Sequence, residues 1–471
     1  MRRLLCATAL LWGSALLSVA TGEPQPTHIP AKRDVPAVVS AKASFDNGDN
    51  GLPFAGYWVN VSIGTPPQSL AMILDLEPGY QTYVMNPLAA AANCSSMLYC
   101  PAHGYFKPED SSSFEIDQAW SSAPEGGGQY TGTDVFKIGE AILPNISFGV
   151  EARSDVAPYA EVNILDISST GLSLPHRLFN AGLTTSPSFS LWNNPSSNDA
   201  EVLFGGINTA KYNGTLQNFP TLDLSTGYNN YTLTLPVKGF KIHLGSDRKT
   251  ATGESVIAYD FNETAFSLNI RSKLTSLPVP YAETDQFYAD LGIPEPGTAL
   301  DGVNCGLRGL GHNVELLIGD MAVSVPWESF FVNGSGADDR GDETETEECR
   351  LLLRARTFDH PRIKGDMSGE IGAVFLRGLY VAVDYESRVI GVAQVNRDPG
   401  EDNVIGFRLD VDGGNIPGTH EDESSQGAGS STDNGEEETA VGDDSTGGAA
   451  VPTAFWGGVA GIVGGIVLGL M

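Results

Sequence analysis

Residues 57–78 read YWVNVSIGTPPQSLAMILDLEP and have the pattern of two β-strands joined by a tight turn. Apolar side chains alternate with polar ones before the turn, Gly-Thr-Pro-Pro supplies the turn, and a second apolar stretch ends at Asp75. A comparable apolar run, Val256–Ala258, stands shortly ahead of Asp260. These segments predict two similarly built loops, each of which presents one carboxylate.

The composition favours a secreted protein with a large β-rich body. The chain has 471 residues, of which 41% are hydrophobic, and its 55 glycines favour turn-rich β structure over helical bundles. A formal net charge of −31 would repel a polyanionic duplex, so we expect no nucleic-acid partner. The sequence motifs of zinc peptidases, serine hydrolases and phosphate-binding loops are missing. We therefore expect no metal and no cofactor.

The N-terminus has the pattern of an exported protein. Residues 1–22 contain two arginines, a short apolar core and then small residues, as a signal peptide does. Residues 23–33 form a short pro-segment that ends in the dibasic pair Lys32-Arg33. Cleavage after this pair would release a mature chain that begins at Asp34.

The C-terminus indicates attachment to a membrane through lipid. Residues 409–453 are rich in Gly, Ser, Thr, Asp and Glu and contain no Lys or Arg, which is typical of a disordered stalk. Residues 454–471 form an uncharged apolar tail preceded by small residues, among which Ser445 and Gly447 are candidate attachment points. This is the pattern of a signal for a glycosylphosphatidylinositol anchor, whose tail is removed. A transmembrane helix is the alternative. The anchored protein would lie on the outer face of the plasma membrane or in the cell wall.

Four cysteines remain once Cys6 is removed with the signal peptide, and an oxidising compartment favours disulfides. Four cysteines allow three connectivities. We favour the local one, in which Cys94 pairs with Cys100 and Cys305 with Cys349, and buried free thiols are the alternative.

Seven asparagines carry the glycosylation pattern Asn-x-Ser/Thr. Asn60 falls in a predicted core strand, so we expect it to stay unmodified. A sugar on Asn262 would lie beside Asp260 and exclude substrate. The alternative is that this loop folds before modification, so that Asn262 stays free of sugar. The predicted acceptors are Asn93, Asn145, Asn213, Asn230 and Asn333.

The order of these segments carries a family resemblance. Residues 57–75 and 133–150, and the stretch IGAVFLRGLYVAVD at 371–384 followed by 390–393, resemble consecutive parts of the pepsin-like aspartic proteases. The signal, dibasic site, stalk and anchor signal are similar to those of the lipid-anchored, yapsin-like branch in fungi. Both local disulfides match positions used in the family.

The resemblance implies a mostly β, bilobal fold with a central cleft that takes a peptide or protein. The N-terminal lobe would comprise residues 50–220 and the C-terminal lobe residues 221–398, and the protein would be a monomer. Asp75 and Asp260 would be the catalytic pair. The flap that closes over substrate should lie between about residues 114 and 133, with Tyr130 as the candidate for its tyrosine.

Both active-site loops depart from the family pattern, in which each Asp is followed by Thr or Ser, then Gly, then Thr or Ser. Here Leu76-Glu77-Pro78 follows Asp75, and Phe261-Asn262-Glu263 follows Asp260. The family also supports each loop with an apolar pair followed by Gly. Ile371-Gly372 keeps this feature, whereas Asp166 follows Ile164-Leu165.

These departures lead to the hypothesis of an impaired enzyme. Aspartic peptidases need two facing carboxylates that share one proton and activate a water molecule. We expect a pseudoprotease whose cleft binds peptide or cell-wall material. The alternatives are an active endopeptidase that uses Asp75 and Asp260 at acid pH, and a purely structural wall protein with a filled cleft.

Overall fold

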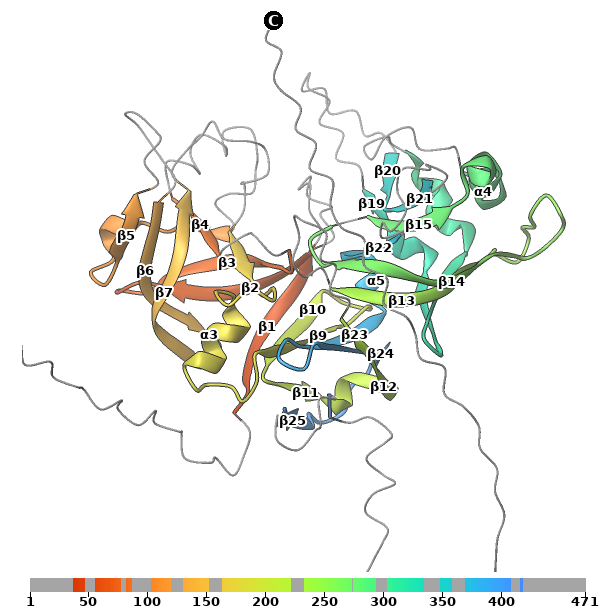
Figure 1. The fold of residues 1–471 in the computed structure, drawn as a ribbon. Coiled ribbons are helices and arrows are strands. Elements are labelled where there is room, and N and C mark those ends of the chain that lie inside the picture. Colours follow the sequence, from red (N-terminus) through yellow and green to blue (C-terminus); the bar gives the residue numbers. More distant parts are fainter. Residues whose placement is uncertain are drawn as a thin grey trace, which may run out of the picture. The chain divides into compact units, whose positions relative to one another are not determined.

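The computed structural model describes residues 37–46, 56–77, 82–86, 103–119, 130–151, 163–221, 233–272, 274–293, 303–333, 348–357, 369–407 and 416–417 (Figure 1). The chain divides into two units, Met1–Asp422 and Glu423–Met471, and every described residue belongs to the first. The segments predicted as signal peptide, pro-segment and anchor signal and most of the predicted stalk, with Lys32-Arg33, Ser445 and Gly447, lie outside the described residues. No helix in the described part is long and apolar enough to cross a membrane.

Thirteen strands of the described chain form the first sheet, in the order β12-β24-β23-β9-β10-β1-β2-β3-β8-β4-β7-β6-β5, and β2 also pairs with β6. Their bounds are β1 (Val39–Asp46), β2 (Gly56–Ile63), β3 (Gln68–Asp75), β4 (Tyr83–Met85), β5 (Glu115–Ala119), β6 (Tyr130–Ile138), β7 (Ala141–Glu151), β8 (Ile164–Asp166), β9 (Ser188–Asn193), β10 (Asp199–Phe204), β12 (Tyr212–Pro220), β23 (Leu379–Asp384) and β24 (Val389–Val395).

A second sheet contains seven described strands in the order β18-β17-β13-β14-β22-β15-β21. They are β13 (Thr234–His243), β14 (Val256–Asn269), β15 (Thr275–Val279), β17 (Asn313–Ile318), β18 (Met321–Pro326), β21 (Leu353–Thr357) and β22 (Gly369–Gly372).

The remaining described elements are short. β11 (Gly206–Asn208) pairs with β25 (Val404–Gly406), and β20 (Glu348–Leu351) lies between β16 (Val303–Asn304) and β19 (Phe331–Asn333). The helices are α3 (Leu174–Asn180), α4 (Thr284–Leu291) and α5 (Ala373–Leu376), and the 3₁₀ turns are η1 (Pro108–Asp110), η2 (Thr209–Lys211), η3 (Tyr281–Glu283), η4 (Cys305–Leu310) and η5 (Trp327–Phe330).

The β2–β3 hairpin forms where the alternating and apolar pattern of residues 57–75 predicts it. Its register pairs Ile63 with Gln68 around the four-residue turn. Gly64 has φ +91°, and a side chain there would strike Ser111, so the turn requires glycine. Near the turn the side chains alternate, with Val61 and Leu70 buried and Asn60 and Ser69 exposed. Further from the turn both faces are buried, because Trp58 and Ile73 pack in a separate apolar cluster.

The predicted lobe boundaries differ from the strand pairing. β1 begins at Val39, before the predicted start at residue 50, and pairs with both β2 and β10. β23 and β24 belong by sequence position to the predicted C-terminal lobe, yet they join the first sheet through β9 and β12. Strands pair through contacts between segments far apart in the sequence, so a boundary drawn at one residue number does not separate the two sheets.

The two sheets contain the same run of four strands. In the first, β3 pairs in parallel with β8, β8 antiparallel with β4, and β4 in parallel with β7. In the second, β14, β22, β15 and β21 repeat these pairings with the same directions. β3 and β14 are therefore equivalent strands, and the residues at their ends occupy equivalent positions.

Candidate active site

The repeat brings Asp75 into correspondence with Asn269. Asp75 ends β3 opposite Asp166 of β8, and Asn269 ends β14 opposite Gly372 of β22. Asn269 therefore stands where the second catalytic aspartate would be expected, so an amide replaces one carboxylate of the pair. Three residues after Asn269, the carbonyl of Ser272 accepts a hydrogen bond from the backbone N–H of Ala373 at 2.8 Å.

Asp260 does not meet Asp75. It lies within β14 opposite Gly239 and is exposed. At about 3.3 Å per residue, the strand between Asp260 and Asn269 is roughly 30 Å long. Because Asn269 contacts the Asp75 loop, Asp260 is placed far along the strand from that loop. The catalytic pairing expected from the sequence is not formed, because Asp260 follows an apolar run as Asp75 does, whereas the position equivalent to Asp75 in the second sheet holds Asn269.

Four side chains from the two loops form what we call the loop cluster: Asp75, Glu77, Asn269 and Arg271. Arg271 Nη1 lies 2.9 Å from Asp75 Oδ2, and Arg271 Nη2 lies 3.7 Å from Glu77 Oε2. Asn269 Nδ2 donates to Glu77 Oε1 at 3.2 Å. The backbone N–H of Glu77 donates to Asp75 Oδ1 at 3.0 Å. The cluster thus joins the ends of β3 and β14 by charge and hydrogen bonds.

Glu77 and Arg271 occupy the positions that hold glycine in the family pattern, each two residues after the position of a catalytic Asp. Glycine at these positions allows close approach of the two loops. Here the two loops instead carry opposite charges that contact each other. The sequence pattern indicates that glycine is lost in both loops, but it places the second loop at Asp260 and so does not point to Arg271. The strand repeat shows that the equivalent loop follows Asn269.

Burial dominates the electrostatics of Asp75. Its side chain is 1% exposed, and burial raises its pKa from 3.8 to about 6. The Arg271 guanidinium and the N–H of Glu77 act in the opposite direction, while the charges of Glu77 and Asp166 raise the pKa further. Asp75 is therefore ionised and paired with Arg271 at neutral pH and protonates in the mildly acid range.

Asp166 is a second buried carboxylate beside Asp75, at the position where the family has glycine. Burial raises its pKa, and hydrogen bonds with Ser168 and Thr170 oppose this shift. The Ser168 N–H donates to Oδ1 at 2.8 Å and the Thr170 hydroxyl to Oδ2 at 3.0 Å. Because both oxygens accept these local bonds, Asp166 is engaged in holding its own turn.

The expected flap segment forms a hairpin at its base. β5 pairs with β6 from Glu115 opposite Thr133 to Ala119 opposite Tyr130. Residues 120–129 and the side chain of Tyr130 lie outside the described part. The flap tyrosine therefore stays a prediction.

The described part of the chain contains the Cys305–Cys349 disulfide, with the two Cα atoms 4.9 Å apart. Cys94 and Cys100 lie outside the described residues. No group of His, Cys, Asp and Glu side chains within the described ranges could hold a metal ion.

Among the predicted glycosylation acceptors, Asn145 and Asn213 are exposed. Asn213 Nδ2 also donates to the Val395 carbonyl at 3.4 Å. Asn93, Asn230 and the side chains of Asn262 and Asn333 lie outside the described residues. Asn60 lies in a strand, as expected, but its side chain is exposed.

Comparison with known proteins agrees with this architecture. A family model described as eukaryotic aspartyl protease matches residues 56–395. The "Probable aspartic-type endopeptidase opsB" of Aspergillus fumigatus is 27% identical over 365 residues, covering 74% of this chain and 70% of the relative. "Aspartic proteinase yapsin-3" of Saccharomyces cerevisiae is 24% identical over 376 residues, covering 74% of this chain and 68% of the relative.

The fold agrees as well. The crystal structure of an aspartic proteinase from Irpex lacteus superposes with a TM-score of 0.51 at 17% identity, covering 76% of this chain and 98% of that one. The mostly β, bilobal pepsin-like fold predicted from the sequence is thereby confirmed. The chain belongs to the eukaryotic aspartyl protease family.

Proposed function

We propose that this protein is a pepsin-like pseudoprotease of the fungal yapsin-like branch, held on the outer cell surface by a lipid anchor. The observation that carries the loss of activity is the loop cluster. In this cluster Asp75 forms an ion pair with Arg271, and the residue equivalent to Asp75 in the second loop is Asn269, which has no carboxylate.

This arrangement does not supply the pair of carboxylates that the chemistry of the family uses. Two carboxylates that share a proton let one act as base toward water while the other donates to the substrate carbonyl. The amide of Asn269 does not exchange a proton in this way. The remaining carboxylate oxygen of Asp75 faces the Arg271 guanidinium at 2.9 Å, which stabilises the ionised form and reduces its strength as a base.

The rest of the proposal follows from the family and from the ends of the chain. Pepsin-like proteases bind peptides between their lobes, so we propose a peptide or protein ligand and a monomeric protein. The signal, dibasic and anchor patterns at residues 1–22, 32–33 and 445–471 support export and lipid attachment. The relatives named opsB and yapsin-3 are fungal, which supports the branch.

The test is a peptide-cleavage assay on the purified protein from about pH 3 to 7, compared with an Asp75→Asn variant. A random peptide library read by mass spectrometry avoids a choice of substrate, and an active pepsin serves as the positive control. We expect no cleavage above background from either protein. Cleavage by the wild type that disappears in Asp75→Asn would establish the alternative, an acid endopeptidase with an altered second loop.

Binding is tested separately, because a pseudoprotease can retain its ligand. A peptide library is passed over the immobilised wild-type protein at pH 5 and pH 7. An immobilised Arg271→Met variant serves as the matched control. Retained peptides that compete with one another support a ligand-binding role. Failure of both surfaces to retain any peptide would favour a structural wall protein.

A further inference from the structure

We infer that Asn60 carries an N-linked glycan, whose first sugar lies in a groove on the outer face of the first sheet. Asn60-Val61-Ser62 has the acceptor pattern, but its place in a strand would suggest a buried and unmodified residue. The inference does not depend on the proposed loss of peptidase activity. It rests on four observations about the strand, the amide, the groove and the hydroxyl at Ser62.

The strand presents Asn60 to solvent. Around Asn60 the side chains of β2 alternate, since Val59 and Val61 are buried and Asn60 is exposed. Trp58, two residues earlier on the same face as Asn60, is buried and stacks on His103. The cross-strand partner of Asn60 on β3 is Ala71, whose small side chain leaves the amide uncovered. The burial of Val59 and Val61, the two neighbours of Asn60, therefore concerns the opposite face of the strand.

The amide nitrogen that would carry the sugar is not used by the fold. Within the described ranges the side chain of Asn60 makes no hydrogen bond, although its backbone belongs to the β2–β3 ladder. By contrast, the buried Asn163 donates through Nδ2 to the carbonyls of Ala71, His103 and Gly104. Attachment of a sugar at Asn60 would thus cost no internal hydrogen bond among these residues.

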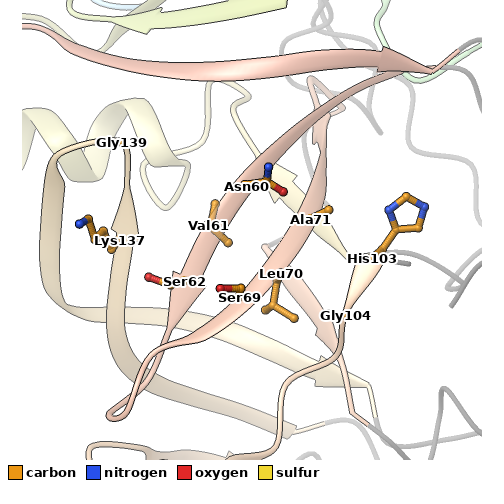
Figure 2. Close-up of a pocket in the computed structure, with 10 residues that line it drawn as sticks. All are labelled: Asn60, Val61, Ser62, Ser69, Leu70, Ala71, His103, Gly104, Lys137 and Gly139. Carbon is orange, nitrogen blue, oxygen red and sulfur yellow. The ribbon is translucent and has the colours of Figure 1, made fainter. Parts of the chain in front are cut away.

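A groove of about 640 Å³ lies beside Asn60 (Figure 2). Pockets that hold small ligands measure roughly 300–1,000 Å³, so a saccharide unit fits. Its floor is made by short side chains of two paired strands, Ser62 and Ser69 among them. Lys137 of β6 lies on one side, and the ring of His103 lines another part. His103 is held in place by stacking on Trp58, with ring centroids 4.0 Å apart.

The modification also needs the hydroxyl two residues after the asparagine. Because side chains two positions apart in a strand lie on the same face, Ser62 accompanies Asn60 on the groove side. The transfer takes place on the nascent chain, before the strand pairs, and the finished fold has to leave room for the product. The groove and the exposed amide meet that requirement.

The reaction is a group transfer from a lipid-diphosphate-linked oligosaccharide in the secretory pathway. The bond between the sugar C1 and the diphosphate oxygen breaks, and a bond forms between C1 and Asn60 Nδ2. Nδ2 loses one proton, and the lipid diphosphate leaves. No redox step is involved.

The test expresses the full chain in a eukaryotic secretory host behind a standard secretion signal, so that entry does not depend on residues 1–22. The recovered protein is treated with a glycan-releasing amidase in heavy-oxygen water and digested, and the peptide that contains Asn60 is analysed by mass spectrometry. Ser62→Ala removes the acceptor pattern and Ser62→Thr retains it, so these variants are a matched pair.

We expect heavy-oxygen aspartate at position 60 in the wild type and in Ser62→Thr, and unmodified asparagine in Ser62→Ala. On a gel, the wild type and Ser62→Thr should migrate together, and Ser62→Ala should lose the mass of one glycan. Unmodified Asn60 in the exported wild type would overturn the inference. So would a label at position 60 that persists in Ser62→Ala.

Discussion

Replacement of Arg271 by methionine should destabilise the protein by an amount that grows with pH above about 6. Arg271 pairs with Asp75, which is 1% exposed and has a pKa of about 6 in the folded protein. Methionine keeps much of the length of the side chain and removes the charge. The change therefore leaves a buried carboxylate without its guanidinium partner.

The magnitude follows from the ionisation of Asp75. At pH 7 the charged form lies about 1.4 kcal/mol below the protonated form, because each pH unit above the pKa is worth about 1.4 kcal/mol. The variant can protonate Asp75 instead of burying an uncompensated charge. The ionisation-dependent loss is thus limited to about 1.4 kcal/mol at pH 7 and about 2.7 kcal/mol at pH 8. It vanishes below about pH 5, where Asp75 is already protonated. Complete loss of a buried pair, about 3–5 kcal/mol, sets the ceiling.

The assay is urea unfolding followed by tryptophan fluorescence at pH 5, 7 and 8. The double variant Asp75→Asn, Arg271→Met should lose the pH-dependent part of the difference, since no carboxylate remains to titrate. Asp110→Asn serves as the surface control, because its pair with Lys107 is largely exposed and worth at most about 1 kcal/mol. If Arg271→Met costs the same free energy at all three pH values, the reasoning about the loop cluster is wrong.

Three further predictions concern stability. The pKa of Asp75 is raised from 3.8 to about 6, so the folded protein binds this proton more tightly than the unfolded chain, and stability should fall by about 2.4 kcal/mol as pH rises from 4 to 7. A pH series of urea midpoints checks this, and a slope that Asp75→Asn leaves unchanged contradicts it. Replacement of Cys305 and Cys349 by alanine opens a loop with a sequence separation of 44. The free energy of unfolding, measured by urea titration without reducing agent, should fall by about 4 kcal/mol. A cost below about 1 kcal/mol would argue against the chain-entropy account. Gly372→Ala places a Cβ against backbone atoms and should lower the free energy of unfolding, measured by urea titration, by about 1–3 kcal/mol, whereas Gly171→Ala meets nothing within 4 Å and should change it by less than about 0.5 kcal/mol. Equal effects of the two alanines would contradict the packing argument.

The location of Asp75 follows from the sequence because its determinants are local. The alternation in residues 57–63, the turn and the apolar run before Asp75 all act within one hairpin, and β2 and β3 form as expected. The Cys305–Cys349 pairing also forms as favoured. Short-range pattern and turn chemistry are properties that a linear sequence carries directly.

The second half of the site depends on contacts that the linear pattern does not contain. Asp260 satisfies the same local pattern as Asp75, yet it lies exposed within β14. The sequence does not mark Asn269 and Arg271 as site residues, because neither side chain has the carboxylate of a catalytic acid. Their role appears only when the β14–β22 pairing is compared with the β3–β8 pairing.

The sequence by itself determined the fold family, the first loop and the loss of its glycine, since these depend on residues adjacent in the chain. The tertiary structure alone decided that Asn269 is the counterpart of Asp75, that Arg271 neutralises it, and that Asn60 faces solvent from within a strand. The physical reason is that charge pairing and burial depend on distances through space. Strand register between distant segments sets those distances.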